Sequence, residues 1–393
     1  MKRSFFNTLM CVALVSLMLS SCESEQSPLT DNTKLWPAFT YNLQTGETKY
    51  GFINKNGDWA IQPTYDGVTT FSNGVAVVVV YNETTDEYTY SYIDKKGNMK
   101  GSFADADQHY CGLARASYDG SIFGFVDASA DFKINPLYEA VNNFSDDLAL
   151  YYDAINENWG YLNTKGEVVI PAIKLAMYDA LSSFSEGLAR VRIEDKYGFI
   201  DKNAKQAIPL IWDYVGSFSD GLAIYEIGDK YGFIDKKGDT KIYAMYDDAA
   251  SFFENGLAPV EQNGKWGFVN KKGDMKIPAM FDDAYPFCEG MALVEINGKY
   301  GFVNTKGDIE IPVIYTDAST YFHNGLAMVS NETATSATYS YINKKGETIW
   351  SLSITSDALA NALSVKSVKA NKTKKAMNDV KPSNHYSLGA FRK

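Results

Sequence analysis

The chain has 393 residues and a formal net charge of −11, and 45% of its residues are hydrophobic and 14% aromatic. Setting aside two cations at the N-terminus and a surplus of +6 in residues 351–393 leaves −11 − 2 − 6 = −19 on residues 23–350. A body of that charge repels phosphate, which excludes nucleic acid as a partner. The many Gly and Tyr residues favour strands and tight turns over helices.

The N-terminus carries an export signal. Lys2 and Arg3 precede an uncharged apolar run over residues 9–19, which is too short for a convincing membrane span. The run ends in Leu19-Ser20-Ser21-Cys22, which resembles the lipobox of bacterial lipoproteins and implies cleavage before Cys22 and lipid on its sulfur. We expect a signal peptide at 1–21, a lipidated Cys22 with a polar tether at 22–35, and anchoring in the bacterial cell envelope, at the periplasmic or surface face of the outer membrane.

Residues 36–350 repeat one pattern about nine times. An aromatic-Gly-aromatic-aliphatic segment is followed by a turn that ends in Gly, and a second signature, Phe-x-x-Gly-Leu-Ala, lies between copies. The spacing of the central positions ranges from 33 to 40 residues. These positions are Gly51, Gly124, Gly160, Gly198, Gly232, Gly267 and Gly301, with Ser91 and Ser340 in two degenerate copies.

Each unit is predicted to be an antiparallel hairpin with a short third strand. In one copy, residues 222–227 and 231–234 flank the turn Gly228-Asp229. Gly232 exposes bare backbone, on which we expect an aromatic ring of a neighbouring repeat to lie. Since Pro cannot donate a ladder hydrogen bond, the third strand is predicted to be an edge strand or to end at its proline. These prolines are Pro63, Pro171, Pro209, Pro278 and Pro312.

The unit closely resembles the WG repeat, also called the KWG repeat, of bacterial proteins. Residues 265–273, Lys-Trp-Gly-Phe-Val-Asn-Lys-Lys-Gly, are nearly its consensus, and Ile277-Pro278 with Phe281-Asp282 matches the segment that follows. The resemblance implies a β-rich repeat protein without a defined activity. Because stacked units bury what one unit cannot, we expect a single all-β array of repeats of about 35 residues. Since nine blades would be unusually many for a propeller, an open superhelical stack is favoured over a closed, propeller-like ring.

Three features leave alternatives open. The long hairpins at 77–90 and 329–339 are either binding loops or relaxed caps near the ends of the array. Cys111 and Cys288 can pair only if the array closes or coils back, and we expect them to be free. Residues 351–393 form a basic tail with a predicted short helix after Ser356-Asp357, and this tail is either solvated or contacts acidic lipid or the acidic body.

No motif for catalysis or metal binding is found. The G-x-S-x-G, H-E-x-x-H, phosphate-loop and spaced calcium-loop patterns are absent from the sequence. Of the three histidines, His109, His323 and His385, the first two lie in repeat turns and have no plausible Ser or Cys partner in sequence context. Paired acids such as Asp247-Asp248 recur at equivalent repeat positions and look like turn residues. We therefore predict a non-enzymatic protein with no catalytic residue, metal or cofactor.

Two binding functions remain. The first hypothesis is a lipid-anchored scaffold that recognises an envelope or extracellular protein through one face of the array. The second is a glycan- or peptidoglycan-binding protein that uses exposed aromatics, for which Trp59 and Trp212 are candidates because they lie outside the signature position. The signature aromatics themselves are expected to be core. An exposed row of Trp or Tyr would favour glycan, and an acidic or apolar face without such a row would favour protein.

Overall fold

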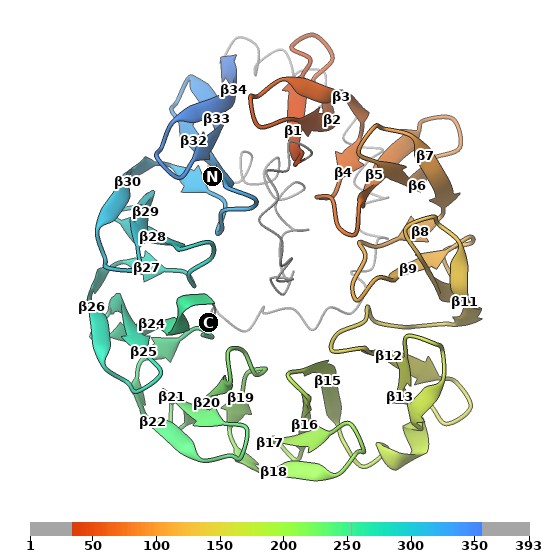
Figure 1. Cartoon of the computed structure of the whole chain (residues 1–393), viewed down its shortest axis with the longest axis vertical. Helices are drawn as coiled ribbons and strands as arrows, with labels where there is room; N and C mark the ends of the chain where they lie inside the picture. The colour runs from red at the N-terminus through yellow and green to blue at the C-terminus, as the bar shows by residue number, and fades with distance from the viewer. Residues whose placement is uncertain (1–33, 253, 356–393) are drawn as a thin grey trace.

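The computed structural model describes residues 34–252 and 254–355, which form nine antiparallel β-sheets arranged as the blades of a closed ring (Figure 1). The blades follow one another around the ring in chain order, so blade 9 lies beside blade 1. A complete blade has four strands, A to D, from the centre outward. Within the described ranges no helix is long and apolar enough to cross a membrane.

The strands of blades 1 to 3 are β1 (Trp36–Tyr41), β2 (Thr48–Ile53) and β3 (Trp59–Tyr65); β4 (Gly67–Val68), β5 (Val75–Asn82), β6 (Glu87–Asp94) and β7 (Met99–Phe103); β8 (Asp105–Ala106), β9 (Ala114–Ser117), β10 (Phe123–Val126) and β11 (Phe132–Tyr138). Those of blades 4 to 6 are β12 (Leu148–Asp153), β13 (Asn158–Asn163) and β14 (Val168–Ile170); β15 (Ala180–Ser185), β16 (Leu188–Ile193), β17 (Lys196–Asp201) and β18 (Gln206–Trp212); β19 (Tyr214–Val215), β20 (Leu222–Ile227), β21 (Lys230–Asp235) and β22 (Thr240–Tyr246). Those of blades 7 to 9 are β23 (Asp248–Ala249), β24 (Leu257–Gln262), β25 (Lys265–Asn270) and β26 (Met275–Phe281); β27 (Asp283–Ala284), β28 (Met291–Ile296), β29 (Lys299–Asn304) and β30 (Ile309–Tyr315); β31 (Asp317–Ala318), β32 (Leu326–Glu332), β33 (Ser336–Asn343) and β34 (Thr348–Thr355). Two short 3₁₀ turns, η2 (Ala172–Lys174) and η3 (Glu254–Gly256), lie in the connections.

The predicted hairpin is confirmed, and it forms strands B and C of each blade. In blade 6 the turn residues Gly228 and Asp229 both have φ of 58°, the geometry of a two-residue turn that matches strand twist. All B–C turns and D–A connections lie at one end of the ring, which we call the B–C end. The A–B and C–D turns lie at the opposite end, the A–B end.

The prediction of three strands per unit missed one, because a complete blade has four. A two-residue strand A, often Asp-Ala, adds to the inner side of strand B, as Asp248 and Ala249 do opposite Glu261 and Val260. So short a strand has no periodicity that a sequence pattern can reveal. The prediction for strand D is confirmed: it is the outer edge strand of each sheet, four of the five prolines lie within it, and β14 ends immediately before Pro171.

The reason proposed for the signature glycine was wrong. A Cβ on Gly267 would lie 2.6 Å from both the Ile277 carbonyl oxygen and the Ala279 nitrogen, which belong to strand D of the same blade. The pairing shifts here from Trp266–Phe281 to Phe268–Ile277, so strand D bulges over the glycine. The backbone of its own sheet, and not a ring from the next repeat, requires glycine at this position.

The core consists of nine buried clusters, one at each junction between neighbouring blades, where an open array of nine blades would have eight. The favoured open stack is therefore wrong, and the blades form a closed nine-bladed propeller. The side chains account for the curvature. Small residues such as Ala249 and Ala258 occupy the inner strands of a junction, whereas the outer strands carry rings such as Tyr246. Each junction is thus narrow at the centre and wide at the rim.

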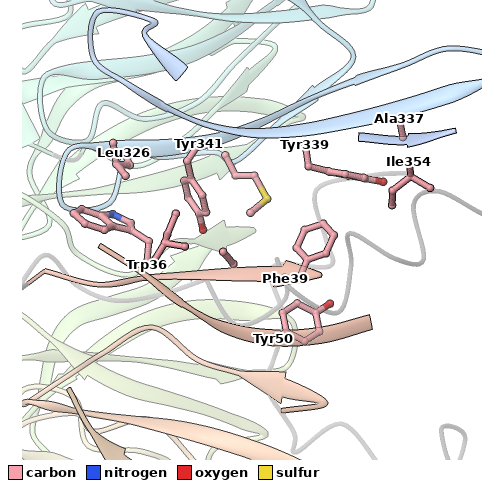
Figure 2. Packing of buried hydrophobic residues seen from close by; sticks show 11 residues of the cluster. Trp36, Phe39, Tyr50, Leu326, Ala337, Tyr339, Tyr341 and Ile354 are labelled. Atoms are coloured by element: carbon pink, nitrogen blue, oxygen red, sulfur yellow. The ribbon is translucent and has the colours of Figure 1, made fainter. Parts of the chain in front are cut away.

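The ninth junction joins the two ends of the described chain (Figure 2). Trp36 is 3% exposed and donates its indole N–H to the His323 carbonyl at 2.7 Å, and the Tyr341 hydroxyl donates to the Pro37 carbonyl at 2.8 Å. The Phe39 ring lies edge-on to Tyr339 with centroids 5.3 Å apart. Within the described residues no strand of blade 1 pairs with blade 9, so side-chain packing closes the ring.

The body is slightly longer than predicted at both ends. Leu35, assigned to the tether, is buried against blade 2, and β34 continues through Thr355 instead of ending at residue 350. The signal peptide, Cys22 and the predicted helix after Ser356 lie outside the described residues. Cys111 and Cys288 are free, in blades 3 and 8. In a closed ring the long hairpins of blades 2 and 9 are not end caps. They lengthen strands B and C of the two blades that lie on either side of blade 1.

Candidate functional site

The charged residues of the repeat signature hold neighbouring blades together at the B–C end. Asp282, in the connection between blades 7 and 8, forms an ion pair with Lys265 of blade 7 and accepts a hydrogen bond from the Asn297 backbone N–H of blade 8 at 2.6 Å. The Lys265 ammonium lowers the pKa of the Asp282 carboxyl group. Lys49–Asp66, Lys196–Asp213 and Lys230–Asp247 repeat this arrangement. The first acid of the Asp-Asp pair is therefore a connection residue, as predicted, whereas the second, such as Asp248, lies in strand A and is not a turn residue.

A second ionic contact recurs at the A–B end. Glu186, in the A–B turn of blade 5, accepts a hydrogen bond from the Gly221 N–H at 3.1 Å and pairs with Lys236 at 2.9 Å, both in blade 6. The pairs Asp146–Lys202, Asp220–Lys271 and Glu289–Lys344 lie at equivalent positions. These signature charges therefore stabilise the ring and are not available as a ligand site.

The aromatic candidates do not form an exposed row. Trp212 is 9% exposed, and its ring packs against Tyr225 of blade 6 at 4.5 Å, so it cannot present a face to a sugar. Trp59 is half-buried against Trp350 at the closing junction. The signature rings Tyr197, Tyr231, Trp266 and Tyr300 are partly buried at the edges of junctions, which agrees with their expected core role.

The two described histidines show no catalytic arrangement. His109 is 3% exposed, burial lowers its pKa, and its Nε2 has no hydrogen-bond partner in the described part of the chain. Nearby, Arg115 donates to Asp107 at 2.9 Å and pairs with Asp105 at 3.4 Å. His323 bonds to the amide of Asn324. Residues 34–252 and 254–355 contain no group of three His, Cys, Asp or Glu placed to hold a metal ion.

The outer rim carries an apolar side chain at one repeated position. The residue immediately before the strand-D aromatic is large and apolar in blades 3 to 8, and its side chain is between 53% and 72% exposed. Register makes five of these positions equivalent, because the following aromatic pairs with the signature ring of strand C in each case; in blade 4 the equivalent residue follows η2. We call this set the apolar rim: Leu137, Met177, Ile211, Met245, Met280 and Ile314.

The remaining three blades differ at this position. By the same register, blades 9, 1 and 2 carry Ser351, Thr64 and Ser102, all exposed. Because the ring is closed, these three blades are consecutive. The rim is therefore divided into an apolar sector of six blades and a polar sector of three, and the polar sector is centred on blade 1, where the chain enters the ring.

The B–C end of blades 6 to 9 is acidic. Asp248 pairs in register with Glu261, Asp283 with Glu295, and Tyr214 with Glu226. Burial raises the pKa of Asp248, and Asp283 and Glu226 on the adjacent blades raise it further. Six of these half-buried acids form no ion pair with a Lys or Arg of the described ranges. We call this set the acidic arc: Glu226, Asp248, Glu261, Glu295, Asp317 and Glu332.

Both surfaces have a sequence signal that periodicity alone does not show. In the sequence, each residue of the apolar rim is a Leu, Met or Ile directly before an aromatic residue, as in Met245-Tyr246 and Met280-Phe281. The acidic arc combines two strand-A acids, Asp248 and Asp317, with one Glu in strand B of each of blades 6 to 9. Alignment of the nine repeats by strand register, and not by the Gly signature, is needed to bring either set together.

Comparison with known proteins identifies the repeat. The family described as WG containing repeat matches residues 50–83, 123–152, 159–197, 197–231, 231–266, 266–300 and 300–332, more than half of the chain. No curated protein matches. Similar solved structures include dihydro-heme d1 dehydrogenase NirN in complex with DHE (9% identity, TM-score 0.41, covering 73% of this chain and 75% of that chain) and Kluyveromyces lactis Hsv2p (9%, 0.38, 63% and 96%). The uncharacterized protein lmo1340 from Listeria monocytogenes EGD-e is a third (10%, 0.34, 61% and 91%). At these values the likeness indicates neither ligand nor activity.

Proposed function

We propose that this chain, which belongs to the WG containing repeat family, is a non-enzymatic, lipid-anchored scaffold of the bacterial cell envelope that binds a protein partner through the apolar rim. The observation that carries the proposal is the repetition of one exposed apolar position over six consecutive blades. Scattered apolar side chains are normal on a surface, whereas a set repeated in register marks an interaction surface. Aliphatic and Met side chains at this set favour protein over glycan.

The polar sector supports the lipid anchor as part of the same proposal. The lipobox-like Leu19–Cys22 precedes the ring, and the tether enters it at blade 1. A molecule held at blade 1 turns its polar sector towards the anchor and its apolar sector away from it. The partner would then bind at the side of the ring that is distant from the membrane attachment.

The apolar rim can contribute a measurable share of the free energy of binding. Burying a large aliphatic side chain contributes about 1.5–3 kcal/mol when it starts fully exposed, so each half-exposed rim residue contributes about 1 kcal/mol. Three adjacent blades together would contribute about 3 kcal/mol, roughly a hundredfold in affinity. A partner that spans several blades can therefore use the repeated position without any single strong contact.

The test uses the mature chain and two triple variants. The rim variant carries Ile211→Ser, Met245→Ser and Met280→Ser, and the control carries Met99→Ser, Ile155→Ser and Ile227→Ser, which are exposed apolar residues outside the rim. After cross-linking in the solubilised envelope, we expect wild type and control to retain the same protein partner and the rim variant to lose it. Binding to purified peptidoglycan and a glycan array is expected to be absent. Partner retention by the rim variant, or saturable glycan binding, contradicts the proposal.

A further inference from the structure

The carboxylates of the acidic arc form no ion pair with a Lys or Arg of the described residues, and all six are partly exposed. Asp317 pairs in register with Ser330, and Asp248 with Glu261, so the acids lie in rows across blades 7 to 9 on the faces towards the next blade. Burial and the Asp317 charge raise the pKa of Glu332. All six side chains are half-exposed, so a cation from outside the ring can reach them.

A buried hydroxyl beside the arc lacks a partner. Ser330 is 1% exposed, and its Oγ has no hydrogen-bond partner in the described part of the chain. Ser330 pairs in register with both Asp317 and Tyr339, so the three side chains share one face of blade 9. A buried polar group without a partner costs about 1–3 kcal/mol. An ammonium group bound at Asp317 would supply a donor next to this oxygen.

The chain itself supplies a cationic segment from the same end of the ring. β34 ends at Thr355, which pairs with Ser336 directly after the B–C turn of blade 9. The chain therefore leaves the described residues at the B–C end, where the arc lies. Residues 356–393 contain eight basic residues (Lys366, Lys369, Lys372, Lys374, Lys375, Lys381, Arg392 and Lys393) and two acidic residues (Asp357 and Asp379), a net charge of 8 − 2 = +6.

Distance and spacing allow this segment to reach the arc. An extended chain spans about 3.3–3.6 Å per residue, so Lys366, eleven residues beyond Thr355, can lie about 36–40 Å away. The five lysines from 366 to 375 occur within ten residues, and the acids recur once or twice per blade. Because the segment is covalently joined to the ring, its effective concentration at the arc is on the order of millimolar, which favours weak ionic contacts.

We propose that the basic C-terminal segment, residues 366–381, binds the acidic arc of its own ring through its lysines. The inference does not depend on the apolar rim, since the arc lies at one end of the ring and the rim on its outer side. In this proposal the lysines of the segment neutralise the acids of blades 6 to 9. The partner surface on the rim stays free.

A zero-length carbodiimide cross-link tests this on the whole mature chain, because it joins lysine ammonium groups to carboxylates in direct contact. We expect cross-links between the lysines of residues 366–381 and the acids of the arc. Their yield should decrease several-fold between about 0.05 and 0.5 M salt, because the Debye length shortens. The control acids Glu167, Asp239 and Glu310, exposed near C–D turns at the A–B end, are expected to give none. Mixing isotope-labelled and unlabelled chains should give cross-links within one chain only.

Three variants keep the test independent of folding. Asp248→Asn, Glu261→Gln and Asp317→Asn together should reduce the cross-links at the remaining arc acids Glu226, Glu295 and Glu332 several-fold, whereas Glu167→Gln, Asp239→Asn and Glu310→Gln should not. Replacing the five lysines from 366 to 375 with Gln leaves the ring unchanged and should also remove them. Cross-links that are absent at low salt, that appear equally on the control acids, or that join labelled to unlabelled chains would each overturn the proposal.

Discussion

The closing junction provides a direct test of the ring, because Phe39 and Tyr339 belong to the first and last blades. Their rings lie 5.3 Å apart at 68°, and Phe39 also contacts Tyr50 and Trp350 at 5.8 and 5.9 Å. An edge-to-face aromatic pair contributes about 0.5–1.5 kcal/mol beyond area burial. We expect the double-mutant cycle of Phe39→Leu and Tyr339→Leu to give a coupling of about 1 kcal/mol.

The magnitude of the single substitution follows from burial. Phe39 is 6% exposed, so Phe39→Ala should reduce the free energy of unfolding by about 3–5 kcal/mol. With an unfolding entropy of about 2.1 cal/mol/K per residue over about 320 residues, 4 kcal/mol corresponds to a fall in Tm of about 6 °C if the ring unfolds cooperatively. Urea titration and differential calorimetry measure both quantities.

An internal junction supplies the reference. Phe268 and Phe287 join blades 7 and 8 with ring centroids 4.8 Å apart, and their cycle should give a similar coupling. A Phe39–Tyr339 coupling within about 0.3 kcal/mol of zero, with normal coupling at Phe268–Phe287, would mean that the ends are not packed in solution. That result would refute the closed ring and restore the open stack.

Four further predictions address single residues. Gly267→Ala should lower the free energy of unfolding by at least about 1–3 kcal/mol, because the added Cβ meets backbone that cannot move aside; chemical denaturation measures this change. Burial raises the pKa of Asp317 in the folded state, so ionisation disfavours folding at neutral pH: Asp317→Asn should raise Tm at pH 7, and the gain should vanish as pH falls through the raised pKa into the acid range. Trp212→Ala should cost about 3–5 kcal/mol of stability, measured by urea titration, while a properly folded Trp212→Phe shows unchanged partner retention. Cys22→Ala should abolish incorporation of labelled palmitate and release the protein from the membrane fraction; membrane retention without label would point to an uncleaved signal instead.

Local features of the fold could be predicted because each is determined by a few adjacent residues. The hairpin at Gly228-Asp229 follows from turn chemistry, and the edge position of strand D follows from its proline. Closure could not be predicted in this way. It depends on the taper of each junction, and residues such as Ala249 and Tyr246 come together only when two sheets pack face to face.

The candidate surfaces were missed for a related reason. Trp59 and Trp212 stood out because they lie outside the signature position, yet both pack in junctions between blades. Met245 is not singled out by the sequence, since one exposed Met is ordinary, and the recurring pair Asp247-Asp248 is interpreted there as turn residues only. Their significance comes from equivalence across blades, which requires the strand register. In a repeat protein, an unusual single residue is a weaker guide to function than an ordinary residue that recurs.

Closure without strand exchange has a consequence for how the chain can be connected. The junction between blades 9 and 1 uses the same kind of buried cluster as the other eight, so the break between the ends of the body has no special structural role. A circularly permuted chain, with the old ends joined and new ends placed in another D–A connection such as that between blades 5 and 6, should form the same ring. The natural position of the ends then determines which sector lies beside the proposed lipid anchor.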